Sequence, residues 1–170
     1  MTAPGIEQTP TPGQTIGPFF GFALPYDGGG ELVPPTRPDA IRFHGRVLDG
    51  AGVPVPDALV ELRQTAPDGS VPRAAGSLQR DGYTFTGWGR AATDRTGHFQ
   101  FSTLRPGGGS PFFALAVFAR GLTDRLFTRA YLPGAAPAQW PSLEAAADDR
   151  GFVFDIRLQG EAETVFLSYR

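Results

Sequence analysis

Two short alternating runs, separated by a turn and two prolines, constrain this chain more than any other feature. Ile41, Phe43 and Val47 alternate with polar side chains in the first run, and Val60 and Leu62 do so in the second. A period of two is typical of half-buried β-strands. The intervening DGAG favours a turn, and VPVP contains two residues without a backbone N–H, which suits an edge or a connection. The pattern predicts a pair of strands that opens an antiparallel β domain and on which later strands pack.

Similar runs recur through the rest of the chain. We expect further strands in residues 99–102, 112–118, 126–132, 152–158 and 165–169, with FFALAVF at 112–118 as the central strand, buried on both faces. Only residues 142–149 look helical, with Ser142 as a candidate N-cap. The 23 Gly and 17 Pro imply many turns and work against long helices. The expected fold is all-β, an antiparallel β-sandwich core with an extended N-terminal arm and long loops.

The first 38 residues differ from the rest in composition. They are rich in Pro, contain a Gly28-Gly29-Gly30 run and show almost no periodicity, as in a disordered tail. Their apolar side chains, Phe19 and Phe22 among them, instead favour an arm that lies on another surface, which can belong to a partner chain. We therefore expect residues 1–38 to form an extended arm that contacts a partner subunit, and residues 39–170 to form the β-sandwich domain.

Composition and charge exclude several classes of function. A net charge of −2 provides no electrostatic footprint for nucleic acid or for an anionic membrane surface. The chain has no Lys for Schiff-base chemistry and no Cys for thiolate nucleophiles, disulfides or Cys-ligated zinc. The N-terminus lacks the features of a signal peptide, and the apolar stretch 17–24 is too short to span a bilayer. The expected compartment is the cytoplasm, with no membrane partner.

No single stretch carries chemistry by itself. GWGRAA at residues 87–92 matches a dinucleotide-binding pattern, but a turn follows where that motif requires a helix. His44 and His98 are far apart in sequence, and neither has a second His or a carboxylate cluster at metal-ligand spacing. Asp148-Asp149 is expected to be the solvated end of a helix. The residues alone therefore predict no self-contained active site.

Several segments taken together resemble the intradiol ring-cleavage dioxygenases. They occur in family order and cover most of the chain: TPTPGQTIGPFF at 9–20, HGRVLDGAGVPVPDALVELRQT at 44–65, GRAATDRTGHFQFSTLRPG at 89–107, FARG at 118–121, TRAYL at 128–132 and FVFDIRLQGEAETVF at 152–166. The resemblance is strongest to the non-catalytic α subunits of the branch that cleaves protocatechuate (3,4-dihydroxybenzoate). It implies a β-sandwich in an oligomer built from αβ pairs. In catalytic members, two Tyr and two His hold Fe(III), and O2 cleaves the bond between the two hydroxylated carbons.

The same resemblance implies that the iron-ligand positions of this chain lack ligands. The two family tyrosines correspond to about Val71 and Gly109, and the His-x-His pair corresponds to Phe112 and Ala114. None of these side chains can donate to hard Fe(III), which needs anionic oxygen or imidazole. The resemblance thus implies no catalytic and no metal-binding residue here. Fe(III) is expected on a homologous iron-binding β subunit, the partner of this chain.

What the chain is expected to contribute is a wall of the partner's active site. In α subunits of this family, the segment matching Thr15, Gly17 and Pro18 and the arginine of FARG, here Arg120, approach the substrate. Protocatechuate carries a carboxylate, which matches the planar donor fork of an arginine. The alternative is that Arg120 only caps a strand end or pairs with an acid such as Asp124.

Two other functions remain open. The chain can be a stand-alone, metal-free β-sandwich that serves as a binding or interaction module. It can also be a homo-oligomeric enzyme with its own metal on His44 and His98, which the sequence spacing disfavours.

Overall fold

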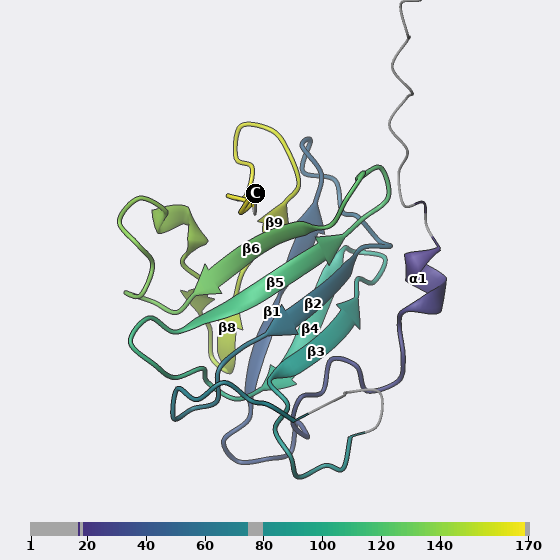
Figure 1. The fold of residues 1–170 in the computed structure, drawn as a ribbon. Coiled ribbons are helices and arrows are strands. Elements are labelled where there is room, and N and C mark those ends of the chain that lie inside the picture. Colours follow the sequence, from purple (N-terminus) through teal and green to yellow (C-terminus); the bar gives the residue numbers. More distant parts are fainter. Residues whose placement is uncertain (1–16, 18, 75–79, 169–170) are drawn as a thin grey trace, which may run out of the picture.

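Two β-sheets face each other in this computed structural model, which describes residues 17, 19–74 and 80–168. The elements in chain order are α1 (Phe20–Ala23), β1 (Ile41–Leu48), β2 (Leu59–Arg63), β3 (Trp88–Ala92), β4 (His98–Thr103), β5 (Phe112–Phe118), β6 (Leu126–Tyr131), the 3-10 helix η1 (Pro141–Leu143), β7 (Ala146–Ala147), β8 (Gly151–Val153) and β9 (Ile156–Arg157). One sheet has the order β4-β1-β8-β7, with β9 also paired to β1, and the other has the order β3-β2-β5-β6. Figure 1 shows the two layers. The predicted all-β sandwich is confirmed.

The core between the sheets is built from the alternating apolar positions that the sequence displays. Phe43 of β1 is fully buried and stacks on Phe113 of β5, with ring centroids 4.1 Å apart. Phe99 and Phe101 of β4 also contact Phe43 and have less than 2% of their surface exposed. Offset and tilted aromatic pairs of this kind add to the stabilisation from burial alone.

The first two strands belong to different sheets, although the sequence predicted a strand pair. β1 pairs with β4, β8 and β9, whereas β2 pairs with β3 and β5. Pro54 and Pro56 lie in the connection and lack the N–H groups that a continuing hairpin ladder needs. The connection therefore crosses from one layer to the other.

Residues 142–149 do not form the predicted helix, so that prediction was wrong. A single 3-10 turn at Pro141–Leu143 is followed by β7, which pairs with β8. Leu143 and Ala145 are both about 1% exposed or less, and the Ala145 N–H donates to the Tyr131 carbonyl. These are contacts of an extended segment on a sheet, and they override a local helical preference.

Four other strand assignments also differ from the expectation. β3 was missed, because its residues read as a chance motif before a turn. The run 152–158 is divided into β8 and β9, and near the C-terminus the structure describes only an isolated bridge between Phe127 and Leu167. β5 is central in its sheet, but only alternate residues (Phe113, Leu115 and Val117) are buried. Its other face is half-exposed, and this face carries the candidate site.

Residues 24–33 lie against the sandwich of this same chain. The Leu24 carbonyl accepts a hydrogen bond from Arg90 Nη1, and the Leu32 N–H donates to the Ser102 carbonyl. Leu32 and Val33 are each only 4% exposed. Residues 1–16 and 18 lie outside the described part, so the predicted division at residue 38 stays a prediction. None of the described helices is long and apolar enough to cross a bilayer.

Candidate functional site

The outer face of the β3-β2-β5-β6 sheet is where the sequence mapping located the family's iron site. The register pairs Arg63 of β2 with Ala114 of β5, and Ala114 with Arg129 of β6. The neighbouring positions Phe112 and Ala116 of β5 point to the same face, because side chains two residues apart share a face. Small alanines in the middle of the face leave space above the sheet.

Two hollows open on this face. The first, called here the loop hollow, has a volume of about 360 Å³ and lies where β2 and β5 meet their loops. All four positions that the resemblance matched to iron ligands line it, namely Val71, Gly109, Phe112 and Ala114. Two separate parts of the chain, the loop after β2 and the segment 109–114, are therefore brought together, as the mapping implies.

The residues of the loop hollow do not fit an iron ion. None of the four positions has a side-chain oxygen or nitrogen, and the polar side chains nearby are already engaged. The Gln64 side chain accepts from the Thr103 hydroxyl and donates to the Leu104 carbonyl, while the Thr65 hydroxyl donates to the Gly107 carbonyl. Among residues 17, 19–74 and 80–168, no group of three or more His, Cys, Asp or Glu is arranged to hold a metal.

The second hollow, called here the sheet hollow, lies next to the first and has a volume of about 400 Å³. Its lining side chains are mostly apolar and aromatic, with charged groups at two sides. They include Glu61, Arg63, Trp88, Phe112, Ala114, Ala116, Phe127 and Arg129.

Arg120 lies beyond the far end of β5, away from both hollows. Its Nε donates to Asp57 Oδ2, and 66% of its side-chain surface is exposed. The anticipated partner Asp124 is instead near Arg125, at 3.8 Å. Because Asp57 holds the inner nitrogen, the terminal nitrogens of Arg120 are left to face outward, with no partner among the described residues.

The N-terminal segment reaches the same end of β5. Phe20 of α1 is buried against Phe118, with ring centroids 6.2 Å apart, and a Cβ on Gly21 would contact the Asp57 carbonyl at 3.9 Å. Figure 1 shows α1 beside the end of β5. Of the expected substrate-facing residues in this segment, Gly17 is described and has φ +66°, whereas Thr15 and Pro18 lie outside the described residues.

Two aromatic side chains, one at the N-cap of α1 and one within this helix, lie exposed beside this site. Phe19 and Phe22 are 74% and 84% exposed, respectively. Large apolar side chains gathered on a surface commonly mark a contact with another chain.

Sequence reasoning missed three side chains that are linked by hydrogen bonds on the other sheet. Asp148 Oδ2 is 2.8 Å from His44 Nε2, and His44 Nδ1 is 3.1 Å from His98 Nε2. β1 and β4 are antiparallel neighbours, and their register brings the two histidines together although 54 residues separate them. Asp148 is also bound by Arg42 at 2.7 Å, so it is not the solvated helix end that the sequence suggested.

The pKa shifts of Asp148 and His98 follow from the contacts within this group of three residues. Burial would raise the pKa of Asp148, but hydrogen bonds from Arg42, His44 and the Arg150 N–H hold that pKa well below its ordinary value. An ionised carboxylate can only accept, so Asp148 Oδ2 accepts from His44 Nε2, and the tautomers of the two rings decide which donates in the His44–His98 contact. Burial, followed by the nearby His44, lowers the pKa of His98. No metal ligand set results, because Asp148 is committed to the outer nitrogen of His44.

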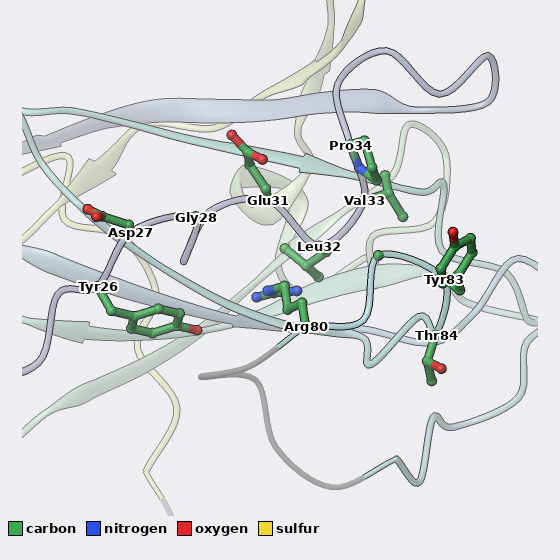
Figure 2. Close-up of a pocket in the computed structure, with 11 residues that line it drawn as sticks. Tyr26, Asp27, Gly28, Glu31, Leu32, Val33, Pro34, Arg80, Tyr83 and Thr84 are labelled. Carbon is green, nitrogen blue, oxygen red and sulfur yellow. The ribbon is translucent and has the colours of Figure 1, made fainter.

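A third cavity, of about 290 Å³, lies under the N-terminal segment (Figure 2). Arg80 Nε and Nη1 and the Tyr26 hydroxyl are buried there without a hydrogen-bond partner in the described part of the chain. Figure 2 shows the Tyr26 hydroxyl turned toward Arg80, with Asp27 and Glu31 at the upper rim. These rim carboxylates disfavour an anion, and the cavity is large enough for ordered water to satisfy the donors.

Comparison with known proteins agrees with the fold. The family model described as Dioxygenase matches residues 34–113. Protocatechuate 3,4-dioxygenase alpha chains from Burkholderia cepacia and Pseudomonas putida are 30% and 31% identical, with 92% and 96% of this chain and 95% and 99% of those chains covered. The dioxygenase domain of a carbohydrate-binding fusion from Streptomyces sp. SirexAA-E has the same fold, with a TM-score of 0.59 and 23% identity over 89% of this chain and 99% of that one.

The sequence identity extends over nearly the full length of the two alpha chains, and the fold is that of a dioxygenase domain. The chain belongs to the intradiol ring-cleavage dioxygenases, a family of non-haem iron oxidoreductases.

Proposed function

We propose that this chain is the non-catalytic α subunit of a hetero-oligomeric protocatechuate 3,4-dioxygenase. The complex would cleave 3,4-dihydroxybenzoate with O2 between the two hydroxylated carbons and release 3-carboxy-cis,cis-muconate. Its Fe(III), held by a homologous β subunit, would supply the oxygen chemistry. The observation that carries the proposal is the loop hollow: Val71, Gly109, Phe112 and Ala114 line one cavity in a dioxygenase fold, and none of them offers an iron donor.

The position of Arg120 supports a role across a subunit interface. The seven residues of β5 span roughly 20 Å at about 3.3 Å per residue, and Arg120 lies beyond its end. This distance excludes action at the loop hollow of the same chain. We therefore assign the substrate of Arg120 to another subunit, and the neighbouring exposed Phe19 and Phe22 form the surface on which that subunit would dock.

Asp57 and Arg120 together form a suitable group for a substrate carboxylate. The Asp57 contact fixes Nε, so the two terminal nitrogens form a fork that matches the two oxygens of a carboxylate. Asp57 is itself only 22% exposed, which anchors the arginine to the sandwich. Thr15, Gly17 and Pro18 would complete this wall from the N-terminal segment.

The substitution Arg120→Ala in the assembled complex tests this role. A charge-assisted hydrogen bond contributes on the order of 1.5–3 kcal/mol, so kcat/KM for protocatechuate should fall roughly ten- to a hundredfold. Plain catechol lacks the carboxylate and should be affected much less, while iron content stays the same. Arg125→Ala is the matched control, because Arg125 is an exposed arginine in the same β5–β6 connection.

Two outcomes would contradict the assignment of Arg120. Equal losses for protocatechuate and catechol would mean that the arginine supports the interface or the fold. An unchanged kcat/KM for both substrates would leave it as a solvated arginine paired with Asp57.

The alternative of a stand-alone, metal-free module makes a different prediction about assembly. In a monomer, Phe19 and Phe22 would leave large apolar side chains exposed to water, which favours the subunit role. Native mass spectrometry of the protein from cells that also contain the β partner distinguishes the two. A stable, iron-free monomer under those conditions would refute the subunit role.

A further inference from the structure

The loop hollow is an apolar surface that stays open in the described part of the chain. Val71 on one side of it is 66% exposed, and Gly108 and Gly109 on the other side are exposed as well. A Cβ added to Gly109 would meet nothing within 4 Å, so there is free space directly above this residue. An open apolar surface of this kind commonly marks a contact with another molecule.

The two ends of β5 carry different surfaces. The loop hollow lies where β5 begins, whereas Arg120 and α1 with the exposed Phe22 lie beyond the end of β5 (Figure 1). In the proposed complex, Arg120 and α1 approach the iron site of a homologous chain. That iron site corresponds in position to the loop hollow, so the end of β5 in one chain lies against the beginning of β5 in the other.

A homologous partner has the same two surfaces. A protocatechuate 3,4-dioxygenase beta chain from Burkholderia cepacia is 31% identical to this chain, with 74% of this chain and 67% of that chain covered. When two related chains pair about a local two-fold axis, every contact between two patches occurs twice, with the chains exchanged. One side-by-side pairing with antiparallel β5 strands therefore brings both ends of each chain into contact.

We infer that the loop hollow is the docking site for the N-terminal segment of the β subunit, an inference that rests on the proposed function. The docked segment is the counterpart of residues 17–24 of this chain, GPFFGFAL. We expect it to be apolar and aromatic, because Val71, Phe112 and Ala114 line the hollow with apolar side chains. Its side chains fill the space above Gly109, and the hollow serves assembly instead of metal binding.

Photo-crosslinking in the assembled complex identifies what covers the hollow. With p-benzoylphenylalanine in place of Val71, this chain should crosslink to the β subunit when the two full-length chains are produced together. Peptide mapping should locate the crosslink in the N-terminal segment of the β subunit, before the first strand of its sandwich. The same group in place of Val53, a 55% exposed position outside the hollow, is the control and should give no such crosslink.

A bulky side chain at Gly109 tests the free space without disturbing the fold. Gly109 does not have a positive φ, and nothing in this chain lies within 4 Å of the new Cβ, so Gly109→Leu should leave the stability of the chain unchanged. It should weaken assembly with the β subunit by about tenfold or more, because the docked segment needs that space. Ala51→Leu adds similar bulk at an exposed turn, and sedimentation should show that it assembles like the wild type.

The possible outcomes separate this inference from the proposed function. Assembly that is unchanged by Gly109→Leu, or a crosslink from position 71 that maps elsewhere on the β subunit, would overturn the inference and leave the proposed function intact. An equal loss of assembly in Gly109→Leu and Ala51→Leu would also contradict docking in the hollow. A wild-type chain that does not assemble with the β subunit would overturn both.

Discussion

At the scale of single residues, the contacts of each ionisable side chain decide its role more than its type does. Two arginines of the same sheet show this, since Arg90 lies in β3 and Arg120 follows β5. Arg90 donates hydrogen bonds to Glu61 and to the Leu24 carbonyl, so it connects the N-terminal segment to the sheet. Arg120 meets Asp57 through one nitrogen only and keeps its terminal nitrogens available.

The Asp148–His44–His98 chain predicts how stability depends on pH. The folded-state pKa of His98 is below its ordinary value of 6.5, because burial and the neighbouring His44, Arg42 and Arg46 disfavour its cation, whereas Asp94 favours it. The unfolded state then binds the proton more readily than the folded state. The contribution of His98 to the free energy of unfolding is therefore fully present above pH 6.5 and is lost as the pH drops below that value. Asp148, with its lowered pKa, stays ionised in this range and contributes a loss only below its ordinary value of 3.8.

Urea unfolding measured between pH 7.5 and pH 5 checks this prediction. His98→Gln keeps a hydrogen-bonding side chain without the titration, and its stability should fall less with acid than that of the wild type. An identical decline in both proteins would assign the pH dependence to other groups.

At the scale of elements, β5 separates the core from the candidate site by alternation alone. Phe113 is fully buried and stacks on Phe43, whereas Phe112 is half-buried on the outer face against Tyr131, with ring centroids 5.3 Å apart. Two neighbouring residues of one strand therefore have different roles: Phe113 packs in the core, and Phe112 lines the hollows on the outer face.

Alanine substitutions at these two adjacent positions should therefore differ in cost. Phe113→Ala leaves a cavity in the core and should lower the free energy of unfolding by about 3–5 kcal/mol. Phe112→Ala should cost about half as much, because its ring is only partly removed from water. Chemical denaturation of the two variants measures the difference, and equal costs would show that Phe112 is as buried as Phe113.

The helix α1 is the second element with an assigned role, as a docking surface. We expect Phe19→Ser with Phe22→Ser to weaken assembly with the β subunit by about 2 kcal/mol or more, because apolar anchors dominate interface energy. The sandwich itself should remain folded, since both side chains are exposed. Val53→Ser, at a 55% exposed position away from α1, is the control.

Sedimentation and turnover of the complex measure the effect, and deletion of residues 1–22 should have the same direction. Unchanged sedimentation and turnover in both variants would favour the disordered-tail interpretation of the N-terminus.

At the scale of the whole molecule, the proposed function divides the work between two homologous chains, with the iron on one and part of the wall of the substrate site on the other. In that proposal, the loop hollow of this chain corresponds to the family's iron site, and Val71, Gly109, Phe112 and Ala114, which line it, offer no iron donor. The opposite end of the sandwich carries the groups that we assign to the partner's substrate. The two ends are joined by β5, so one rigid strand positions both.

This arrangement predicts the metal content of the separated subunits. The isolated chain should contain no stoichiometric iron and show no visible charge-transfer absorption between tyrosinate and iron. The assembled complex should contain iron in proportion to its β subunits. Elemental analysis and visible spectra of both preparations test this, and stoichiometric iron in the isolated chain would refute the assignment.

The sequence by itself determined the fold class, whereas the match of Phe112 and Ala114 to the family's iron ligands stays a prediction. Alternation in β1, β2, β4 and β5 is a local property of the chain, so it can be recognised without any spatial contact. The prediction for Phe112 and Ala114 likewise needs only the order of motifs along the chain.

The tertiary structure alone decided which distant residues meet. Antiparallel pairing of β1 with β4 joins His44 to His98, and pairing of β2, β5 and β6 places Arg63 and Arg129 on either side of Ala114. The sequence also misassigned residues 142–149 as a helix, because local preference carries no information about the sheet edge on which they pack. Partners such as Asp57 for Arg120, 63 residues apart, depend on chain crossings between strands that no local pattern encodes.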